Sequence, residues 1–335
     1  MITIKDIAKE SGYSVGTVSR VLNDSEGVSD KARNAIMAVV NKYNFRLNSN
    51  ARLLKQQTHS GIAVILKGAE NMLFAAITEL LQKRIEKSGC ECSLFYLNEE
   101  DNEVRFAQRL VRERKPEGIL FMGSNLDFFR NDFRGIDLPC VLVTNDGSGL
   151  GYPNVSSVST DDMSAAEVII DTLVSKGHKR IGIVGGDTRY STASRYRLEG
   201  CRRAFLKNGI PFDEQIQYES GHYTLDSGYE ATGRLFRKMP DVTAIFAMSD
   251  VTAIGVMRAA ADRGISVPLD LSLTGFDGID ISDYMTPRLA TIRQNRELIA
   301  SKSIEILLSM IRDGAGSVHE VVPFTLKNGD SIRSI

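Results

Sequence analysis

The sequence predicts an α/β protein with a small N-terminal domain of three helices, a short linker helix and two doubly wound parallel-sheet lobes. Residues 1–46 hold three short helical stripes of apolar residues. From residue 61 onward, short apolar runs alternate with helical segments, a pattern typical of parallel sheets covered by helices on both faces. The chain has 335 residues, which is enough for two or three domains of ordinary size.

The composition excludes several classes of protein. The chain is 42% apolar and 25% charged, which is ordinary for a globular protein. It has neither an apolar run near the roughly 20 residues that cross a bilayer nor the apolar core of a signal peptide. The four cysteines, Cys90, Cys92, Cys140 and Cys201, lack metal-site or disulfide-framework spacing. We therefore expect a cytoplasmic protein with free thiols, no metal, no cofactor and no membrane partner.

Charge is distributed unevenly along the chain. Residues 1–59 contain nine lysines and arginines against five aspartates and glutamates, although the whole chain carries a net charge of −1. A basic N-terminal segment on an acidic body indicates a module that binds a polyanion, joined to a part with a different task.

The first three helices have clear start and stop signals. Thr3 and Asp6 have the spacing of a capping box, and Gly12 ends the helix that they begin. Ser14 is placed to cap a second helix and Ser29 a third. Three short helices with a tight turn after the first make a helix-turn-helix module.

The second helix has a thin polar face that suits the major groove of DNA. That face carries Gly16, Ser19, Arg20 and Asn23, opposite an apolar stripe. The guanidinium of Arg20 can bridge O6 and N7 of a guanine, and hydroxyls on this face can bond to phosphates. The alternative is a three-helix interaction bundle whose polar face is only solvated.

Residues 3–24 (TIKDIAKESGYSVGTVSRVLND), followed by VSDKARNAI, closely resemble the N-terminal domain of the lactose-repressor (LacI) family of bacterial transcription factors. TVSRVLN, residues 17–23, is among the most specific signals of that family. The resemblance implies that Val15, Gly16 and Arg20 read bases. It implies phosphate contacts by Thr3, Ser14, Thr17, Ser19, Asn23 and Ser29.

The linker RLNSNARLLKQQ, residues 46–57, can form one helix of two to three turns. So short a helix is marginal in water, so we expect it to fold on a partner. In the family it is a hinge helix that enters the minor groove as a pair, with a leucine wedged between base pairs. The resemblance assigns DNA contacts to Asn48, Ala51 and Leu54. Leu47 replaces the usual proline, and the alternative is that the linker leucines pack on the body.

The body is expected to contain two series of alternating elements. The first has strands over 61–66, 92–97, 118–122 and 140–143, with helices over about 72–88 and 100–114 and a short third helix. The second begins near 154–159 and continues with strands over 180–186, 216–220, 244–248 and 271–276. Between these strands we expect helices over about 162–176, 194–208, 226–238 and 250–263.

Polar and aromatic residues follow several of these strands, where ligands of doubly wound sheets bind. An arginine and carboxylates there can hold the vicinal hydroxyls of a sugar or the edges of a heterocycle. Phe74 and Tyr223 can stack on its apolar face. The predicted ligand contacts are Phe74, Asp161, Ser191, Arg197, Tyr223, Asp250 and Asp277. Each taken singly has an alternative role as a helix cap or salt-bridge partner.

The resemblance continues through the body. KGHKRIGIVGG, SRYRLEG, AIFAMSD, LSLTGFD and MTPRLATIRQN are similar to landmarks of the family's effector domain, which is itself similar to periplasmic sugar-binding proteins. Arg197 and Asp277 match effector-contacting positions, and the other predicted contacts match more variable ones. Thr144-Asn145-Asp146 departs from many relatives, which leaves the identity of the effector open.

In the family the chain crosses between the lobes three times, which places the crossings here near 160, 291 and 322. The expected domains are 1–46, which binds DNA, 47–59, the hinge, and 60–335, which binds effector. The N-lobe is expected over 60–160 and 292–321, and the C-lobe over 161–291 and 322–335.

We therefore expect a ligand-responsive regulator, a repressor, that binds a palindromic operator. A sugar or sugar derivative in the inter-lobe cleft would control its DNA affinity. Tight binding needs two half-sites about one turn apart, and therefore two copies of the chain. No leucine-heptad tail of the kind that forms tetramers precedes Ile335, so we expect a homodimer. A transport receptor would explain the lobes but needs an export signal and leaves the basic head without a role.

An enzyme is the third alternative. The sequence contains no P-loop or GxGxxG motif, and its GxSxG match, Gly12–Gly16, lies in the helix-turn-helix segment rather than between a strand and a helix, so no catalytic residues are assigned. The four histidines lie far apart, and His178 follows a helix end, where we expect it to cap.

Overall fold

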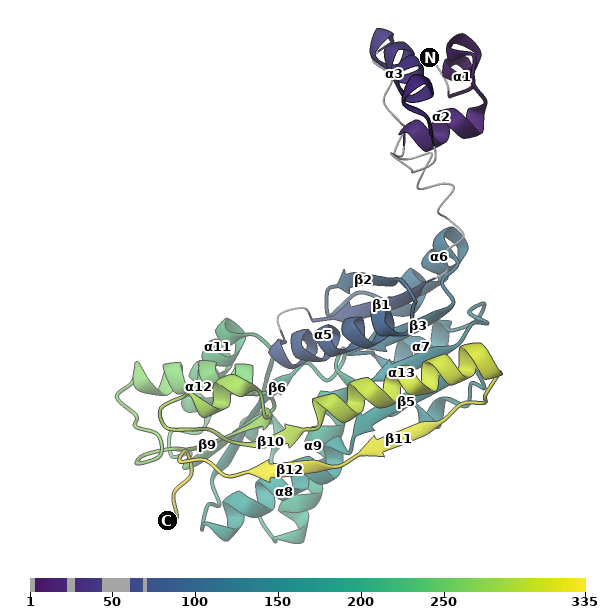
Figure 1. The fold of residues 1–335 in the computed structure, drawn as a ribbon. Helices are drawn as coiled ribbons and strands as arrows, with labels where there is room; N and C mark the ends of the chain where they lie inside the picture. The colour runs from purple at the N-terminus through teal and green to yellow at the C-terminus, as the bar shows by residue number, and fades with distance from the viewer. Residues whose placement is uncertain (1–3, 23–27, 44–60, 69–70) are drawn as a thin grey trace. The chain divides into compact units, whose positions relative to one another are not determined.

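The computed structural model describes residues 4–22, 28–43, 61–68 and 71–335. The chain divides into two compact units, Met1–His59 and Ser60–Ile335. The smaller unit contains the helices α1 (Ile4–Ser11), α2 (Val15–Leu22) and α3 (Asp30–Lys42), seen in purple in Figure 1.

The three helices of the smaller unit close on a small core. Ile7, Val18 and Ile36, one from each helix, are fully buried. Gly12, with a φ of +74°, ends α1 as expected. The caps are also confirmed: Ser14 Oγ accepts a hydrogen bond from Thr17 N at 3.1 Å, and Ser29 Oγ accepts one from Ala32 N at 3.4 Å. Thr3, Asn23 and the hinge residues Asn48, Ala51 and Leu54 lie outside the described residues.

The larger unit contains two six-stranded sheets. The first sheet has the order β11-β5-β4-β3-β1-β2 and the second β12-β10-β9-β8-β6-β7. The strands of the first are β1 (Ile62–Lys67), β2 (Cys92–Leu97), β3 (Gly118–Met122), β4 (Cys140–Val143), β5 (Val155–Thr160) and β11 (His319–Val322). Those of the second are β6 (Ile181–Gly186), β7 (Tyr218–Gly221), β8 (Ala244–Ala247), β9 (Ser272–Asp277), β10 (Ala290–Gln294) and β12 (Phe324–Lys327).

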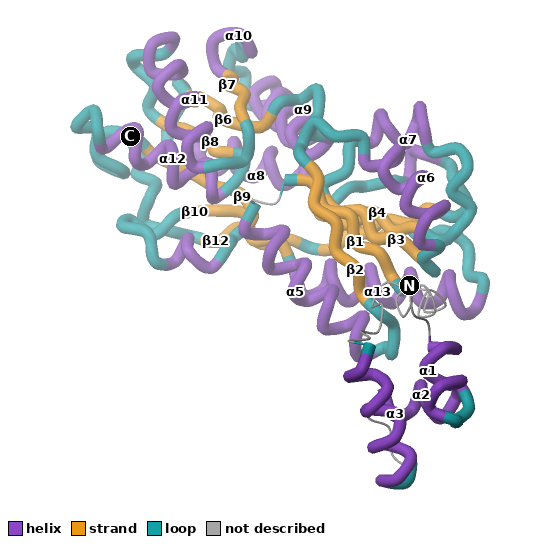
Figure 2. The backbone as a smooth tube through the Cα atoms, turned by 90° about the horizontal axis from the view of Figure 1, so that it is seen from above, coloured by secondary structure: helices purple, strands orange, loops and turns teal. Residues whose placement is uncertain are grey.

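All pairings are parallel except that of β10 with β12. The doubly wound α/β architecture is therefore confirmed, with helices covering both faces of each sheet (Figure 2). The first sheet is flanked by α5 (Met72–Lys87), α6 (Glu103–Arg114), α7 (Leu126–Asp132) and α13 (Arg296–Asp313), with the short η1 (Ser148–Leu150). The second is flanked by α8 (Asp162–Ser175), α9 (Thr192–Lys207), α10 (Glu214–Gln217), α11 (Leu225–Lys238), α12 (Asp250–Ala261) and η2 (Asp280–Asp283).

Each sheet has an apolar core on both faces. In the first lobe α5 and α13 pack on one face, and α6 and α7 pack on the other. In the second lobe α8 and α9 share one core, and α11 and α12 share the opposite one. The chain passes from one sheet to the other between β5 and α8, between β10 and α13, and between β11 and β12.

One element was assigned to the wrong series. The expectation that the second series begins near 154–159 is wrong, because β5 pairs with β4 and β11 in the first sheet. Its buried serines are satisfied by distant groups: Ser156 Oγ lies 3.1 Å from Met310 Sδ and accepts a hydrogen bond from Val318 N. The pattern of β5 alone could not show partners about 150 residues away.

His178 has a further role beside the expected one. Its ring is fully buried and bonds to Thr243 Oγ1 at 2.9 Å and to the carbonyl of Arg333 at 3.1 Å. The ring therefore ties the loop after α8 to the segment that follows β12, while the backbone N–H of His178 donates to the carbonyl of Leu173 at 3.1 Å and so caps the end of α8, as expected. Burial lowers the pKa of His178. None of the described helices is both long and apolar enough to span a membrane.

Candidate functional site

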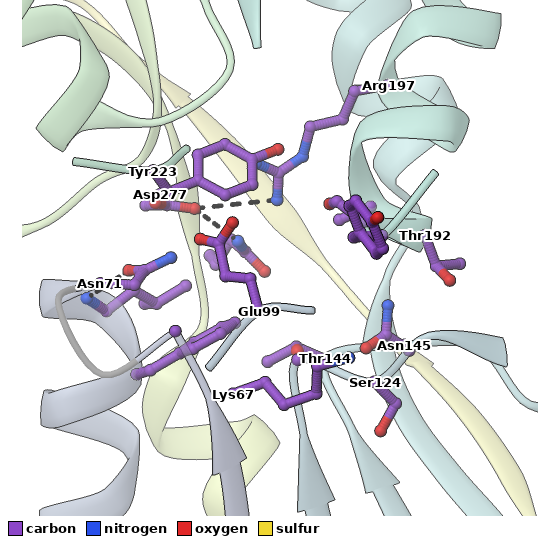
Figure 3. Close-up of a pocket in the computed structure, with 18 residues that line it drawn as sticks. Lys67, Asn71, Glu99, Ser124, Thr144, Asn145, Thr192, Arg197, Tyr223 and Asp277 are labelled. Carbon is purple, nitrogen blue, oxygen red and sulfur yellow. Dashed lines mark hydrogen bonds and ion pairs between the residues drawn. The ribbon is translucent and has the colours of Figure 1, made fainter. Parts of the chain in front are cut away.

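A cleft lies between the two lobes of the larger unit, and its empty space, which opens to solvent, is about 640 Å³. Its walls are built from residues at and just beyond the carboxyl ends of strands in both sheets, as doubly wound topology requires. Figure 3 shows Arg197, Tyr223 and Asp277 of the second lobe facing Lys67, Ser124, Thr144 and Asn145 of the first.

Arg197 projects from α9 and is buried. Its Nε donates to Oδ1 of Asp162 at 2.7 Å, its Nη1 donates to the carbonyl of Met248, and its Nη2 lies 3.8 Å from Oδ1 of Asp277. The guanidinium carbon also lies 3.6 Å from the ring centroid of Phe276. Burial opposes the charge, yet the neighbouring acidic groups, Asp162 foremost, hold the pKa of Arg197 above its ordinary value.

Asp277 ends β9 in an unusual backbone conformation. Its φ of +111° lies in a region that residues other than glycine rarely adopt, and such strain is typical of functional sites. Oδ1 accepts a hydrogen bond from Nε2 of Gln294 at 2.9 Å, whereas Oδ2 is buried without a partner in the described structure. Burial raises the pKa of Asp277 to about 7, although Arg197 and Gln294 oppose the rise.

Tyr223 and Ser191 complete the wall of the second lobe. The hydroxyl of Tyr223 lies 2.6 Å from Oγ of Ser194, and burial raises the pKa of Tyr223. Ser191 Oγ accepts a hydrogen bond from Ser194 N at 3.1 Å and so caps α9. Across the cleft, a Cβ at Gly123 would come within 2.8 Å of the Phe74 ring. The absence of a side chain at Gly123 therefore allows Phe74 to lie over the end of β3.

The first-lobe floor, defined here as Lys67, Ser124, Thr144 and Asn145, is polar but poorly bonded. Oγ of Ser124 and Oδ1 of Asn145 are buried with no hydrogen-bond partner in the described structure. Thr144 is a β-branched residue with a φ of +76°, which is a genuine outlier. Buried polar atoms normally have hydrogen-bond partners, so these two oxygens are available to bond to a ligand.

Five of the seven predicted ligand contacts line this cleft. They are Phe74, Ser191, Arg197, Tyr223 and Asp277.

Asp161 and Asp250 do not line the cleft, which corrects their expected position. Asp161 is exposed, and its Oδ1 accepts from Ser164 N at 2.9 Å, so its carboxylate caps α8. Asp250 is fully buried and accepts hydrogen bonds from Thr291 Oγ1 at 2.6 Å and Ile279 N at 2.8 Å. Both carboxylates thus accept hydrogen bonds from protein donors. The bond from Ile279 N to Asp250 supports the loop that follows Asp277.

Sequence reasoning missed other residues of the cleft. Among them are Lys67, Asn71, Glu99, Ser124, Asn145 and Gln294. The signal was present, because Lys67 ends β1, Ser124 and Asn145 each follow a strand by two residues, and Gln294 ends β10. The same strand-end rule, applied to every strand, would have found Lys67, Ser124 and Asn145 on the first sheet and Gln294 on the second.

The smaller unit presents a second candidate surface on α2. Gly16 is exposed, and a Cβ there would meet only Ser14 Oγ, at 3.7 Å. Ser14 is exposed and bonds to Thr17 Oγ1 at 2.9 Å. Val15, Ser19 and Arg20 lie on the same helix. The outer face of α2 near its start is therefore thin enough for close approach to a groove.

Comparisons with known proteins agree with this two-part organisation. The family model of bacterial regulatory proteins, lacI family, matches residues 3–48, and a periplasmic binding protein-like domain matches residues 170–332. The HTH-type transcriptional regulator MalR of Clostridium butyricum is 33% identical over 343 residues, covering 100% of both chains.

Solved structures show the same fold. A complex of the transcriptional regulator CelR with cellobiose has a TM-score of 0.71 at 24% identity, covering 99% of this chain and 100% of that one. A lac repressor dimer bound to operator and the anti-inducer ONPF has a TM-score of 0.73 at 23% identity, covering 99% of each chain. With the helix-turn-helix unit and the two-lobed body in place, the match to MalR establishes that the chain belongs to the lacI family of bacterial regulatory proteins and is a DNA-binding transcriptional regulator.

Proposed function

We propose that the protein is a repressor that binds a palindromic operator as a homodimer, and that a sugar or sugar derivative in the cleft controls its affinity for the operator. The observation that carries the ligand class is the set of unpaired polar atoms in the cleft, namely Ser124 Oγ, Asn145 Oδ1 and Asp277 Oδ2. Sugar hydroxyls both donate and accept hydrogen bonds, so one polyhydroxylated ligand can satisfy donors and acceptors on both walls.

The other groups of the cleft fit the same ligand. Arg197 and Asp277 lie side by side, so they can hold two adjacent hydroxyls. The rings of Phe74 and Tyr223 line the cleft and offer surfaces for the apolar face of a sugar ring. CelR, which is similar in fold, forms a complex with cellobiose, which supports a carbohydrate without identifying it.

The smaller unit supplies the DNA contacts in this proposal. Val15, Gly16 and Arg20 read base edges in the major groove from α2. Phosphates are held by Thr3, Ser14, Thr17, Ser19, Asn23 and Ser29. The hinge residues Asn48, Ala51 and Leu54 enter the minor groove. The lac repressor of similar fold is a dimer on its operator, which supports two copies and two half-sites.

The proposal includes the domain limits and the place of action. Residues 1–46 bind DNA, 47–59 form the hinge and 60–335 bind the effector. The first lobe spans about 60–160 and 295–322, and the second about 161–294 and 323–335, because β10 ends at Gln294 in the second sheet and β11 ends at Val322 in the first; this corrects the expected limits at 292 and 321. The protein acts in the cytoplasm, where bacterial DNA lies, and we assign it no catalytic residues.

The experiment tests ligand binding and DNA binding on the same full-length protein. A thermal-shift screen over monosaccharides, disaccharides and nucleobases should identify a ligand that adds about 2.7 kcal/mol to the free energy of unfolding at 100 times its Kd. An operator selected from random DNA is then titrated with and without that ligand. An operator affinity that does not change at saturating ligand contradicts the proposal.

The Arg20→Ala variant tests the DNA-binding surface separately. Loss of a bidentate base contact should cost about 1–3 kcal/mol on operator DNA and much less on random DNA. Equal losses on both would show that Arg20 contacts only phosphate.

A further inference from the structure

A buried ion pair lies at the first-lobe floor, outside the residues predicted from the sequence. Lys67 ends β1 and lines the cleft, and its side chain is 3% exposed. Glu103 begins α6, is 1% exposed and lies behind Lys67, away from the cleft lining. The distance from Lys67 Nζ to Glu103 Oε2 is 3.0 Å.

The bonding of this pair leaves donors of Lys67 free. An ammonium has three N–H donors, and within the described structure Glu103 is the hydrogen-bond acceptor found for Nζ. The ring centroid of Phe128 lies 5.0 Å from Nζ, which provides a second, weaker contact. Glu103 uses its other oxygen, Oε1, to accept from Asn125 N at 2.7 Å. Both oxygens of the carboxylate therefore accept a bond, whereas the ammonium can still donate into the cleft.

Stability does not explain why this pair is buried. Replacing a buried ion pair by apolar residues is often neutral or stabilising, because both charges lose their hydration. The rest of β1, from Ile62 to Leu66, is apolar and buried, so an apolar residue at position 67 would continue the same pattern. Lys67 lines the cleft, which points to a role of the pair in ligand binding.

The other cleft cation is also neutralised. Arg197 bonds to Asp162 and lies near Asp277, and Glu99 at the rim bonds to His222 at 2.8 Å. Among the described residues that line the cleft, each lysine or arginine thus has a carboxylate partner. An anionic ligand would therefore approach three buried carboxyl groups, those of Glu103, Asp162 and Asp277, without meeting an unpaired cation. It would lose its hydration without gaining a compensating charge.

We propose that Lys67 donates a hydrogen bond to an uncharged oxygen of the effector and that Glu103, by cancelling the charge of Lys67, makes the cleft select neutral sugars over sugar phosphates and sugar acids. This inference rests on the proposed function, because it presupposes a carbohydrate effector. It names Lys67 as a ligand-contacting residue and Glu103 as the residue that sets charge selectivity.

The test compares matched neutral and anionic probes by isothermal titration calorimetry on the full-length protein. The pairs are glucose with glucose 6-phosphate and with glucuronate, ribose with ribose 5-phosphate, and maltose with maltobionate. Whichever sugar the wild-type protein binds, its neutral form should bind at least about tenfold more tightly than its phosphate or acid. Tighter binding of a phosphate or acid would overturn the inference while leaving the proposed function intact. No binding of any sugar would remove the carbohydrate effector and this inference together.

The Glu103→Gln variant tests the cause of the selectivity. It leaves the Lys67 ammonium uncompensated, so the ratio of neutral to anionic affinity should fall by about tenfold or more. The matched control is Glu219→Gln, which removes a buried carboxylate paired with Arg234 and Lys238 away from the cleft and should leave the ratio unchanged. An unchanged ratio in Glu103→Gln would contradict the inference.

A double variant keeps the test valid if the single change impairs folding. Lys67→Met combined with Glu103→Gln removes both charges, so no buried charge is left without a partner. It should melt near the wild-type temperature, bind the neutral sugar about tenfold more weakly and gain no affinity for the anionic one. Full neutral-sugar affinity in this variant would exclude Lys67 from the site.

Discussion

The two walls of the cleft differ in how completely their polar groups are bonded before a ligand arrives. On the second-lobe wall Arg197 has two hydrogen-bond acceptors and Ser191 caps a helix, although Oδ2 of Asp277 is buried without a partner there. On the first-lobe floor Ser124 and Asn145 each present a buried oxygen with no partner in the described structure. A bonded wall loses little freedom on binding, whereas an unbonded one gains its missing partners from the ligand. The second lobe therefore fixes the site's geometry, and the first gains most when the cleft is filled.

The largest expected effect comes from breaking the bonded wall. Arg197→Met leaves Asp162 buried and unpaired, so the free energy of unfolding should fall by about 3–5 kcal/mol, and ligand binding should be lost. Urea denaturation with the cleft empty measures the first effect, and calorimetry with the identified ligand measures the second.

The control for this prediction is the double variant Arg197→Met/Asp162→Asn. It removes both charges, so most of the lost stability should return while ligand binding stays absent. If the double variant is as unstable as the single one, the buried pair is not the reason that Arg197 stabilises the lobe.

The second prediction concerns pH and the unpaired oxygen of Asp277. Because the pKa of Asp277 is raised to about 7 from 3.8, its contribution to stability is complete below about pH 4 and is lost as the pH rises to about 7. The free energy of unfolding of the ligand-free protein should therefore fall over this interval relative to that of Asp277→Asn. Paired urea titrations at several pH values measure the difference, and a parallel pH dependence in the two proteins would contradict it.

Ligand binding should reverse this effect. A sugar hydroxyl that donates to Oδ2 favours the ionised carboxylate, so binding near neutral pH should release a proton. Calorimetry in buffers of different ionisation enthalpy detects that proton, and Asp277→Asn should release none from this position.

The sequence predicted the bonded wall better than the unbonded one. Arg197, Tyr223 and Asp277 are large or charged residues after strands, which stand out against turn residues. Ser124 and Asn145 are of the types that turns commonly use, so their position after a strand looked ordinary. Only the structure shows that their side chains are buried without partners.

The same ambiguity explains the two misplaced aspartates. Asp161, Asp250 and Asp277 all follow strands and look equivalent in sequence. In the structure Asp161 turns back to cap its own helix, and Asp250 reaches Thr291 on β10. Asp277 lines the cleft, in a left-handed backbone conformation. Strand and helix order follows from local patterns, whereas the direction of each side chain depends on which donor it reaches, three residues away in the chain for Asp161 and 41 residues away for Asp250.

A matched pair of serine variants compares the two walls directly. Ser191→Ala removes a helix cap and should lower the free energy of unfolding by about 1 kcal/mol. Ser124→Ala removes a buried hydroxyl that has no partner, so the stability of the ligand-free protein should stay the same or rise. Ligand affinity should nevertheless fall in Ser124→Ala, by up to about tenfold. A loss of ligand-free stability in Ser124→Ala would show that its hydroxyl already has a partner and that the two walls are alike.

The smallest effect is expected at a contact that joins the walls. Arg195 on α9 donates from Nη1 to Asp127 Oδ2 on α7 at 2.6 Å, with the two side chains 33% and 40% exposed. A pair this exposed is worth less than about 1 kcal/mol, so Arg195→Gln should barely change stability. Because the contact links the lobes, its loss should disfavour the arrangement that encloses the ligand. The effector midpoint, meaning the effector concentration that gives half of the change in operator binding, should then rise about threefold.

Arg130→Gln provides the matched control, because Arg130 bonds to the same Asp127 at 2.8 Å from within α7 and does not reach the second lobe. It should leave the effector midpoint unchanged. Salt screens an exposed pair, so the effect of Arg195→Gln should shrink as ionic strength rises. Equal shifts in the two variants would mean that the charge of Asp127 matters rather than the link between the lobes, and the first lobe would then contribute to ligand binding only through its floor.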